Sequence, residues 1–349
     1  MRSQMGETMK GVRIHAPGDL RLDRIGVPEL GPLDVKIAVA HTGVCGTDLH
    51  IYDGWQMGPM VTLQNYPALI GHELAGTIAA VGDAVTTRRV GERVTVQPQI
   101  YCGVCVMCER GNGNMCRNKI RFAHGGSWAD YLVVNEKQAY RIPDAVSTEL
   151  ASLSEPLGCA MRAVERARIS PGDTALVTGG GTIGLMLVAL AKRLGTSLVA
   201  CSEPVAARRQ LAKRLGADLV FDPVNDDLDG LVGSATAGVG FDISFEASGA
   251  IPAAEACIAA VRDGGTVIQM AISHPDEHLQ IRPLDVCLRE IEIRGTVLMQ
   301  SNMESVLRLM PQLGLEPMIT HVLPLAAATE AILMCKRGEA TKVLFDPAL

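Results

Sequence analysis

The sequence predicts an α/β protein with two domains, a mostly β, barrel-like domain and a doubly wound parallel-sheet domain. Short strand-like runs broken by Gly and Pro fill residues 9–150, which is typical of a small barrel. After Pro171, short apolar strands alternate with helical runs, as in a parallel sheet covered on both faces. The length of 349 residues also suits two cores better than one.

Each element follows from its own local pattern. In the first domain we expect strands at "DVKIAVA", "AGTIAAVG", "GERVTV" and "WADYLVV". In the second, "TALVT" is a short buried strand, followed by glycines and the helical run "TIGLMLVALAKRLG". The related segments "AKRLGTSLV" and "AKRLGADLV" place Gly195 and Gly216 just after helices, each before the next strand.

The last part of the chain predicts a discontinuous arrangement. The alternation of strands and helices fades from about Glu290, and "ATKVLFDPAL" at the end reads as a strand that rejoins the first domain. We therefore expect residues 1–156 and 297–349 to form one domain, with residues 157–296 inserted as the other.

Composition excludes several classes of partner. The chain is 48% hydrophobic and 20% charged, with a formal charge of −6, so it offers no general attraction to nucleic acid or to anionic membrane. No apolar run reaches the ~18 residues of a membrane span. The first residues contain no apolar signal-peptide core, so we expect none to be present. Ten cysteines in such a chain indicate thiols and a cytoplasmic protein.

A glycine-rich loop predicts dinucleotide binding. Gly179, Gly181 and Gly184 have the G-x-G-x-x-G spacing, directly after a predicted strand and at the start of a helix. The first glycine permits a tight turn, the second lets the backbone approach a pyrophosphate, and the third lets helix and strand pack closely. The phosphates would lie at the helix N-terminus.

An acidic residue favours NAD over NADP. Glu203 ends the next predicted strand, close to the ~20-residue spacing at which a carboxylate binds the ribose 2′-hydroxyl. That carboxylate would repel a 2′-phosphate. Arg208 and Arg209, one turn later, could soften the preference.

Four closely spaced cysteines predict a structural zinc site. Their spacing is C-x2-C-x2-C-x7-C, and four thiolates this close can hold one tetrahedral zinc ion. An iron–sulfur cluster is the alternative, but the ferredoxin run has a three-residue last spacer followed by proline. The residues are Cys102, Cys105, Cys108 and Cys116.

A second group predicts a catalytic zinc. Cys45 lies in a glycine-flanked loop, and His72 and Glu73 stand together in "GHELAG". One thiolate, one imidazole and one carboxylate suit a zinc ion with an open coordination position. The charge opposite the buried Glu73 would then be the metal. Glu155 in "SEPLG" is a second carboxylate that could bind the zinc directly or through its water.

With these motifs in order, the chain resembles the zinc-dependent medium-chain alcohol and polyol dehydrogenases. The matching pieces are "GVCGTDLH", "GHELAG", "GERV", the four-cysteine loop, "SEPLG" and "GGGTIG" with its following glutamate. The resemblance implies a GroES-like catalytic domain that holds both zinc ions. It also implies a Rossmann domain that holds NAD, and a homodimer or homotetramer.

The resemblance also implies roles for single residues. Thr47 would contact the substrate hydroxyl, and His50 would relay its proton to solvent. Ile183 would back the cofactor, and Arg208 would lie near its adenosine. The implied catalytic residues are Cys45, Thr47, His50, His72, Glu73 and Glu155. The implied cofactor-binding residues are Gly179, Gly181, Thr182, Ile183, Gly184, Glu203, Arg208 and Ala271.

Two branches of that family compete for the substrate. "CGTDLHIYDGW" resembles L-threonine 3-dehydrogenase, whereas "SEPLG" resembles the sorbitol, idonate and butanediol dehydrogenases. Sorbitol dehydrogenases have an Arg-Tyr pair where this chain has Leu298 and Met299. We therefore expect a smaller or less polar secondary alcohol, such as a small diol. A catalytically silent, nucleotide-binding member is the alternative of another class, but it should have lost Cys45 or His72.

Overall fold

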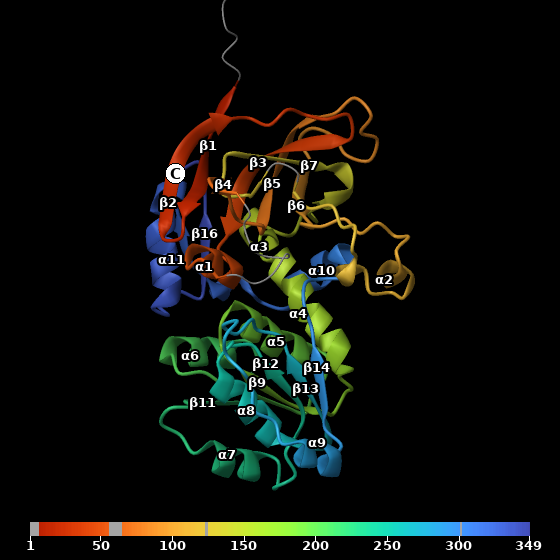
Figure 1. Cartoon of the computed structure of the whole chain (residues 1–349), viewed down its shortest axis with the longest axis vertical. Helices are drawn as coiled ribbons and strands as arrows, with labels where there is room; N and C mark the ends of the chain where they lie inside the picture. The colour runs from red at the N-terminus through yellow and green to blue at the C-terminus, as the bar shows by residue number, and fades with distance from the viewer. Residues whose placement is uncertain (1–6, 56–64, 123–124, 301) are drawn as a thin grey trace, which may run out of the picture. The chain divides into compact units, whose positions relative to one another are not determined.

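The structure, a computed structural model, describes residues 7–55, 65–122, 125–300 and 302–349. The chain forms two compact units, drawn in Figure 1. Unit 1 consists of Met1–Glu155, Ser301–Pro311 and Ile319–Leu349. Unit 2 consists of Pro156–Gln300 and Gln312–Met318.

Unit 1 is mostly β-structure, as expected for the first domain. Its described residues form a three-stranded sheet of order β2-β1-β4 and a seven-stranded sheet of order β15-β16-β3-β5-β6-β8, in which β7 also pairs with β3. The strands are β1 (Thr8–Ala16), β2 (Asp19–Gly26), β3 (Asp34–Gly43), β4 (Ala68–Leu69), β5 (Leu74–Val81), β6 (Arg93–Val96), β7 (Tyr131–Asn135), β8 (Ala139–Arg141), β15 (Ile319–Leu323) and β16 (Lys342–Phe345). The helices are α1 (Gly46–Tyr52), α2 (Val106–Glu109), α3 (Thr148–Ala151), α10 (Met303–Leu309), α11 (Ala328–Lys336) and the beginning of α4 (Ser154–Ala167).

The strand at the end of the chain joins unit 1, as the sequence predicted. β16 pairs antiparallel with β3, with Leu344 opposite Gly43 and Phe345 opposite Thr42. All four residues of β16 are buried. Its first residue, Lys342, is therefore carried into the interior beside the end of β3.

Unit 2 contains a six-stranded parallel sheet of order β11-β10-β9-β12-β13-β14. Numbered within the unit this order is 3-2-1-4-5-6, the doubly wound arrangement whose ligand crevice lies where the order reverses. That position is the carboxyl edge between β9 and β12. The strands are β9 (Thr174–Thr178), β10 (Leu198–Ser202), β11 (Leu219–Phe221), β12 (Phe241–Glu246), β13 (Val261–Gln269) and β14 (Glu292–Gly295). The helices are α5 (Thr182–Arg193), α6 (Ala206–Arg214), α7 (Leu228–Ala235), α8 (Ile251–Ala260) and α9 (Pro283–Arg289).

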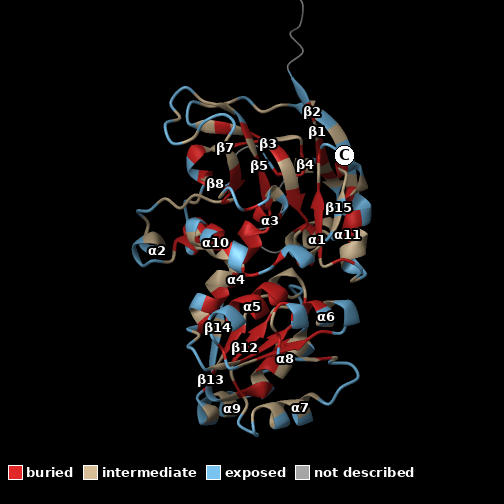
Figure 2. Ribbon diagram, turned by 180° about the vertical axis from the view of Figure 1, so that it is seen from behind, coloured by how far each residue is buried: buried red, intermediate tan, exposed pale blue. Residues whose placement is uncertain are grey.

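Helices cover both faces of this sheet because the crossovers run in opposite directions from its centre. Right-handed connections place α5 and α6 on one face and α8 on the other. The central strands are accordingly buried on both sides (Figure 2). Gly195 and Gly216 adopt φ of +88° and +109° after α5 and α6, the left-handed conformation expected at helix C-termini.

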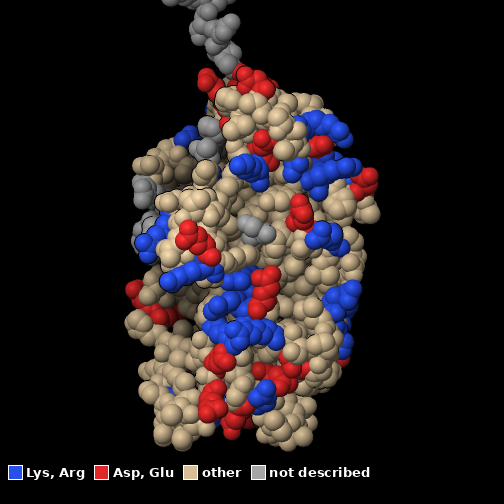
Figure 3. Space-filling view, turned by 90° about the vertical axis from the view of Figure 1, so that its right-hand side faces the viewer, with Lys and Arg blue, Asp and Glu red and all other residues tan. Residues whose placement is uncertain are grey.

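Acidic and basic side chains are interspersed on the face drawn in Figure 3, and the net charge is −6. Among the described residues, no helix combines the length and apolar character needed to cross a bilayer.

Candidate functional site

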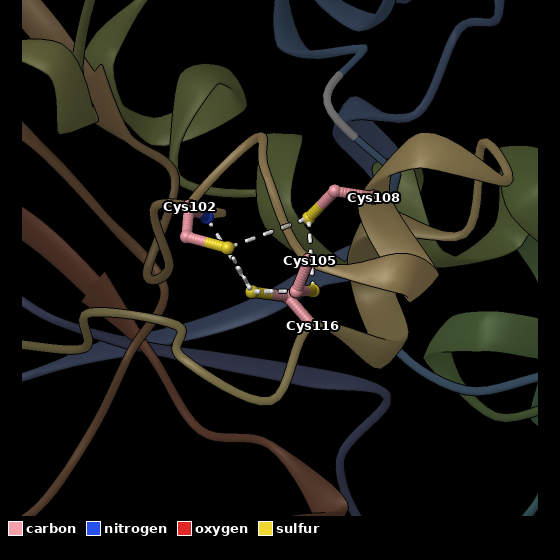
Figure 4. A group of neighbouring side chains, drawn as sticks. All are labelled: Cys102, Cys105, Cys108 and Cys116. Carbon is pink, nitrogen blue, oxygen red and sulfur yellow. Dashed lines mark hydrogen bonds between the residues drawn. The ribbon is translucent and has the colours of Figure 1, made fainter.

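Four cysteine side chains converge in the loop around α2, as Figure 4 shows. The sulfur atoms of Cys102 and Cys116 are 3.5 Å apart, those of Cys105 and Cys108 3.6 Å, and those of Cys105 and Cys116 3.9 Å. The sulfurs of Cys102 and Cys108 are 4.0 Å apart. The four atoms thus surround one point.

These separations fit a single tetrahedral metal ion. With Zn–S bonds of about 2.3 Å, the edge of the tetrahedron is roughly 3.8 Å. An iron–sulfur cluster lies between its cysteines and would hold them farther apart. Backbone N–H groups, that of Cys108 first, lower the pKa of Cys105 to about 6, and the backbone N–H of Cys102 lowers the pKa of Cys116. Both thiols are therefore inclined towards the thiolate form that binds metal. Burial, with hydrogen bonds from the neighbouring thiols, raises the pKa of Cys108 to about 12 instead.

The second group lies where β3, α1 and β5 meet. Cys45 precedes α1, and His72 and Glu73 precede β5. One ligand atom from each of these residues lies within 4.8 Å of the others. Glu73 is 1% exposed, so it is not part of a solvent-facing strand edge. The geometry suits one metal ion held by a thiolate, an imidazole and a carboxylate.

A buried lysine faces Glu73, and sequence reasoning missed it. The Lys342 ammonium group, 1% exposed, forms an ion pair with the Glu73 carboxylate and donates a hydrogen bond of 2.8 Å to the carbonyl oxygen of Val44. Burial lowers the pKa of Lys342, but Glu73 and Cys45 outweigh it and the net shift is upward. Glu73 thus has a permanent cationic partner in addition to the metal that the sequence led us to expect.

Asp48 lies close to the imidazole of His72. It is fully buried on α1, and one carboxylate oxygen accepts the backbone N–H of Cys45 at 2.9 Å. The other oxygen lies 3.9 Å from Nδ1 of His72, which is beyond hydrogen-bond distance, and it has no hydrogen-bond partner among the described residues. Burial lowers the pKa of His72, but Cys45, Asp48 and Glu155 raise it more, so the pKa is well above its ordinary value.

Glu155 lies near the group but is not part of it. Among the described residues, the atoms that meet at metal-binding distance come from Cys45, His72 and Glu73. Glu155 is buried in the first turn of α4 and is near enough to His72 to raise the pKa of that imidazole. A role of Glu155 through a water molecule stays a prediction.

The two predicted relay residues share helix α1. Thr47 and His50 are three residues apart and half-buried, so they lie on one face of the helix. His50 stacks on Trp55, with ring centroids 4.0 Å apart, a contact that the sequence analysis did not foresee. Burial lowers the pKa of His50, and Asp53 opposes this only in part. The imidazole is therefore neutral over a wider range of pH than usual.

In unit 2 the glycine-rich loop connects β9 to α5, as predicted. Gly179 adopts a φ of +93°, and a Cβ atom on Gly184 would collide with the carbonyl oxygen of Gly179. A Cβ atom on Gly181 would meet nothing within 4 Å. The third glycine is thus required by packing, whereas the second leaves open space beside the helix N-terminus.

Glu203 follows β10 at the same edge of the sheet. It is 3% exposed. Its carboxylate accepts the backbone N–H groups of Gly180 at 2.6 Å and Val205 at 2.8 Å. The side chain therefore reaches across to the glycine-rich loop, where a ribose beside the pyrophosphate would lie.

The remaining predicted cofactor residues lie on elements at this edge. Thr182 and Ile183 begin α5, and Arg208 lies in α6. Ala271 follows β13, and its backbone N–H donates to the carbonyl oxygen of Glu246 at 3.2 Å. All four are partly exposed.

Sequence reasoning missed Glu246, which ends β12 beside the glycine-rich loop. It is fully buried, and it accepts hydrogen bonds from the backbone of Ser248 and Gly249 at 2.7 and 2.9 Å and from Gln269 Nε2 at 2.8 Å. The run "FEASG", a strand ending in a carboxylate before Ser-Gly, was the available signal.

Comparison with known proteins matches segments of both units to dehydrogenase families. Residues 31–144 match the model of the alcohol dehydrogenase GroES-like domain. Residues 182–312 match the model of the zinc-binding dehydrogenases.

Individual relatives match over nearly the whole chain. An L-threonine 3-dehydrogenase of Pyrococcus horikoshii is 35% identical, covering 98% of this chain and 99% of its own. A D-arabitol-phosphate dehydrogenase of Enterococcus avium is 33% identical over 98% of both chains. A zinc-binding dehydrogenase of Sinorhizobium meliloti, solved with bound NADP, superposes with a TM-score of 0.89 at 30% identity, covering 98% of this chain and all of its own.

Proposed function

Because the chain belongs to the zinc-dependent medium-chain alcohol and polyol dehydrogenase family, we propose that it oxidises a small secondary alcohol to a ketone and transfers the hydride to NAD. The observation that carries this proposal is the convergence of Cys45, His72 and Glu73 within 4.8 Å. Three ligands leave a tetrahedral zinc ion one open position for an alcohol oxygen.

The chemistry assigns tasks to the residues around that position. Cys45, His72 and Glu73 would hold a zinc ion there, and the ion would act as a Lewis acid that lowers the pKa of the alcohol. Thr47 hydrogen-bonds to the substrate hydroxyl, and His50, one turn later on α1, receives the proton and passes it to solvent. The neutral imidazole favoured by the lowered pKa of His50 supports this role.

The other parts have structural tasks. The second zinc ion is held by the four cysteines of the α2 loop, which the sulfur separations support. We propose residues 1–156 and 297–349 as the GroES-like catalytic domain and residues 157–296 as the Rossmann domain. The compact units differ from these bounds, because residues 156, 297–300 and 312–318 belong to unit 2. The homodimer or homotetramer and the cytoplasmic location expected from the sequence stay predictions.

NAD is the proposed cofactor. One relative of similar structure binds NADP, so family membership alone does not decide between the two. In this chain the buried carboxylate of Glu203 lies against the glycine-rich loop, and a 2′-phosphate there would meet a like charge.

The proposed substrate is a small secondary alcohol, such as a diol or a short polyol. Leu298 and Met299 provide no charged anchor for a long polyol. L-threonine is the second candidate, favoured by the 35% identical threonine dehydrogenase. The silent, nucleotide-binding alternative is disfavoured because Cys45 and His72 are both present and adjacent.

The test combines a substrate screen with metal analysis. NAD reduction is measured against secondary alcohols, diols, polyols and L-threonine, and elemental analysis should find two zinc ions per chain. Cys45→Ala should lose one zinc ion and the activity but keep the fold. The control Cys287→Ala, at an exposed position outside both candidate metal groups, should keep both zinc ions. One zinc ion in the wild type, or iron with sulfide, would contradict the metal assignment.

A further inference from the structure

The end of β11 lies beside the end of β10, where the proposed cofactor ribose is recognised. The two strands are parallel, with Ser202 opposite Phe221, and the backbone N–H of Glu203 donates to the carbonyl oxygen of Phe221 at 3.1 Å. The next residue after β11, Asp222, therefore emerges at the same edge of the sheet as Glu203.

An arginine joins these two strand ends. Nη1 of Arg209 donates to the carbonyl oxygens of Glu203 and Pro204, both at 2.7 Å. The same nitrogen lies 3.1 Å from Oδ2 of Asp222, and the two side chains are only 20% and 15% exposed. The guanidinium group is thus held against the backbone that presents Glu203.

Asp222 is held in its charged form and in a fixed position. The backbone N–H of Val224 and the side-chain amide of Asn225 donate to its carboxylate at 3.0 and 3.1 Å. These hydrogen bonds, the one from Val224 first, keep its pKa below the ordinary value, with a contribution from Arg209. The ion pair therefore has one rigid partner.

A guanidinium group at this edge would ordinarily favour a phosphorylated ribose, because arginine binds phosphate through two parallel hydrogen bonds. Arginine near the ribose is also how NADP is accommodated in this fold. Here, however, Arg209 is already neutralised. We propose that Asp222 is a specificity-determining residue that retains Arg209 against the β10–β11 edge and so keeps it from binding the 2′-phosphate of NADP.

This inference rests on the proposed function, and it assigns part of the cofactor choice to a residue beyond Glu203. The carboxylate of Glu203 meets the ribose, whereas Asp222 acts through Arg209. Preference for NAD then depends on an ion pair as well as on one acidic side chain.

The chain offers a matched control at the other end of the same strand. Asp218 precedes β11 and likewise pairs with a cation, Lys192 Nζ at 2.7 Å, and accepts a backbone N–H, that of Val199, at 2.8 Å. It lies at the amino edge of the sheet, away from the glycine-rich loop. Asp218→Asn and Asp222→Asn therefore remove similar ion pairs at opposite ends of β11.

The test is a titration of NADH and NADPH by nicotinamide fluorescence, which needs no alcohol substrate. Asp222→Asn should raise the affinity for NADPH relative to NADH by about tenfold, the effect of one charge-assisted hydrogen bond. Asp218→Asn should leave the ratio unchanged. Far-UV circular dichroism checks that each variant is folded.

A second variant separates the mechanism from its alternatives. Combining Asp222→Asn with Arg209→Leu should abolish the gain, because the freed guanidinium is what binds the 2′-phosphate. Arg209→Leu alone should not improve NADPH binding. An unchanged ratio in Asp222→Asn overturns the inference. A gain that survives in the double variant also overturns it, since Arg208 or the lost charge of Asp222 would then be responsible. A wild-type protein that binds neither nucleotide would instead overturn the proposed function.

Discussion

The Lys342–Glu73 ion pair is sealed from solvent at the candidate catalytic centre. Removing one partner of a buried pair leaves the other charge without compensation, which costs more than the pair itself contributes. In this molecule a bound metal ion would be a second cation beside Glu73. The loss in free energy of unfolding on removal of Lys342 should therefore depend on whether metal is present.

Lys342→Met should accordingly lower the free energy of unfolding by about 3–5 kcal/mol in zinc-free protein and by clearly less in zinc-loaded protein. The measurement is denaturant unfolding with and without zinc. The matched control is Lys336→Met, which breaks the exposed pair between Lys336 and Asp53 and should cost less than about 1 kcal/mol in both states. Equal losses for Lys342→Met with and without zinc would refute a metal beside Glu73.

Protonation of His50 should cause the fall in the rate of alcohol oxidation at acidic pH. Because burial lowers its pKa, the imidazole stays neutral, and able to accept a proton, to below pH ~6.5. Wild-type kcat/KM should therefore begin to fall only below that pH. His50→Gln should lose this inflection, with activity reduced by up to about 10²-fold near neutral pH and less at alkaline pH, where hydroxide replaces the relay.

His321→Gln is the control for this profile. His321 lies on β15 and contacts Thr320 through Nδ1 at 3.0 Å, and neither residue belongs to the candidate site. Its substitution should leave the profile unchanged, and an unaltered profile in His50→Gln would remove His50 from the reaction.

At the scale of elements, the glycine-rich turn between β9 and α5 has glycines for two different reasons. Gly184→Ala should destabilise unit 2 by about 1–3 kcal/mol, the cost of overpacking, because its Cβ would collide with the Gly179 carbonyl. Gly181→Ala should leave stability unchanged, since its Cβ meets nothing, but should weaken NADH binding at least tenfold. Thermal unfolding and NADH titration distinguish the two, and a stable Gly184→Ala variant would contradict the packing argument.

The four-cysteine loop is an element with little apolar packing of its own. Val104 and Met115, within it, are 76% and 46% exposed, so metal binding is its main source of order. Cys105→Ser should increase the rate of proteolytic cleavage in this loop at least about tenfold, which corresponds to a loss of 1.4 kcal/mol in the free energy of opening. Removal of the metal by a chelator should have the same effect on the wild-type protein. Cys287→Ser is the control. If Cys105→Ser and the zinc-loaded wild type were cleaved at equal rates, the order of the loop would not depend on metal.

Elements and ligand motifs were predictable from sequence because their signals are local. The strand–glycine–helix run at Thr174–Arg193 and the four cysteines within fifteen residues carry their own spacing. Lys342 carries no such signal, since it lies 269 residues from Glu73 and meets it only through the pairing of β16 with β3. The Arg209–Asp222 pair likewise depends on tertiary packing. The stack of Trp55 on His50 is local by contrast, because the two residues are five positions apart at the end of α1.

At the scale of the whole molecule, the chain leaves unit 1 at Glu155 and returns to it from Ser301. The main segment of unit 2 is thus an insertion, to which the short segment Gln312–Met318 is added. Its 3-2-1-4-5-6 strand order is complete without any strand of unit 1. Each unit also has its own buried core (Figure 2). The two candidate metal groups both belong to unit 1, whereas the glycine-rich loop belongs to unit 2.

Because Lys342 lies on β16 near the end of the chain, it is synthesised long after its partner Glu73. A ribosome that has just made Glu73 must add 269 more residues before Lys342 exists, which takes on the order of tens of seconds at ~5–20 residues per second. Unit 2 has time to fold in that interval. During the same interval the Glu73 carboxylate of the nascent unit 1 has no Lys342 to pair with. A zinc ion captured by the emerging chain would neutralise Glu73 during the wait, so metal supply during translation should affect the yield of folded protein.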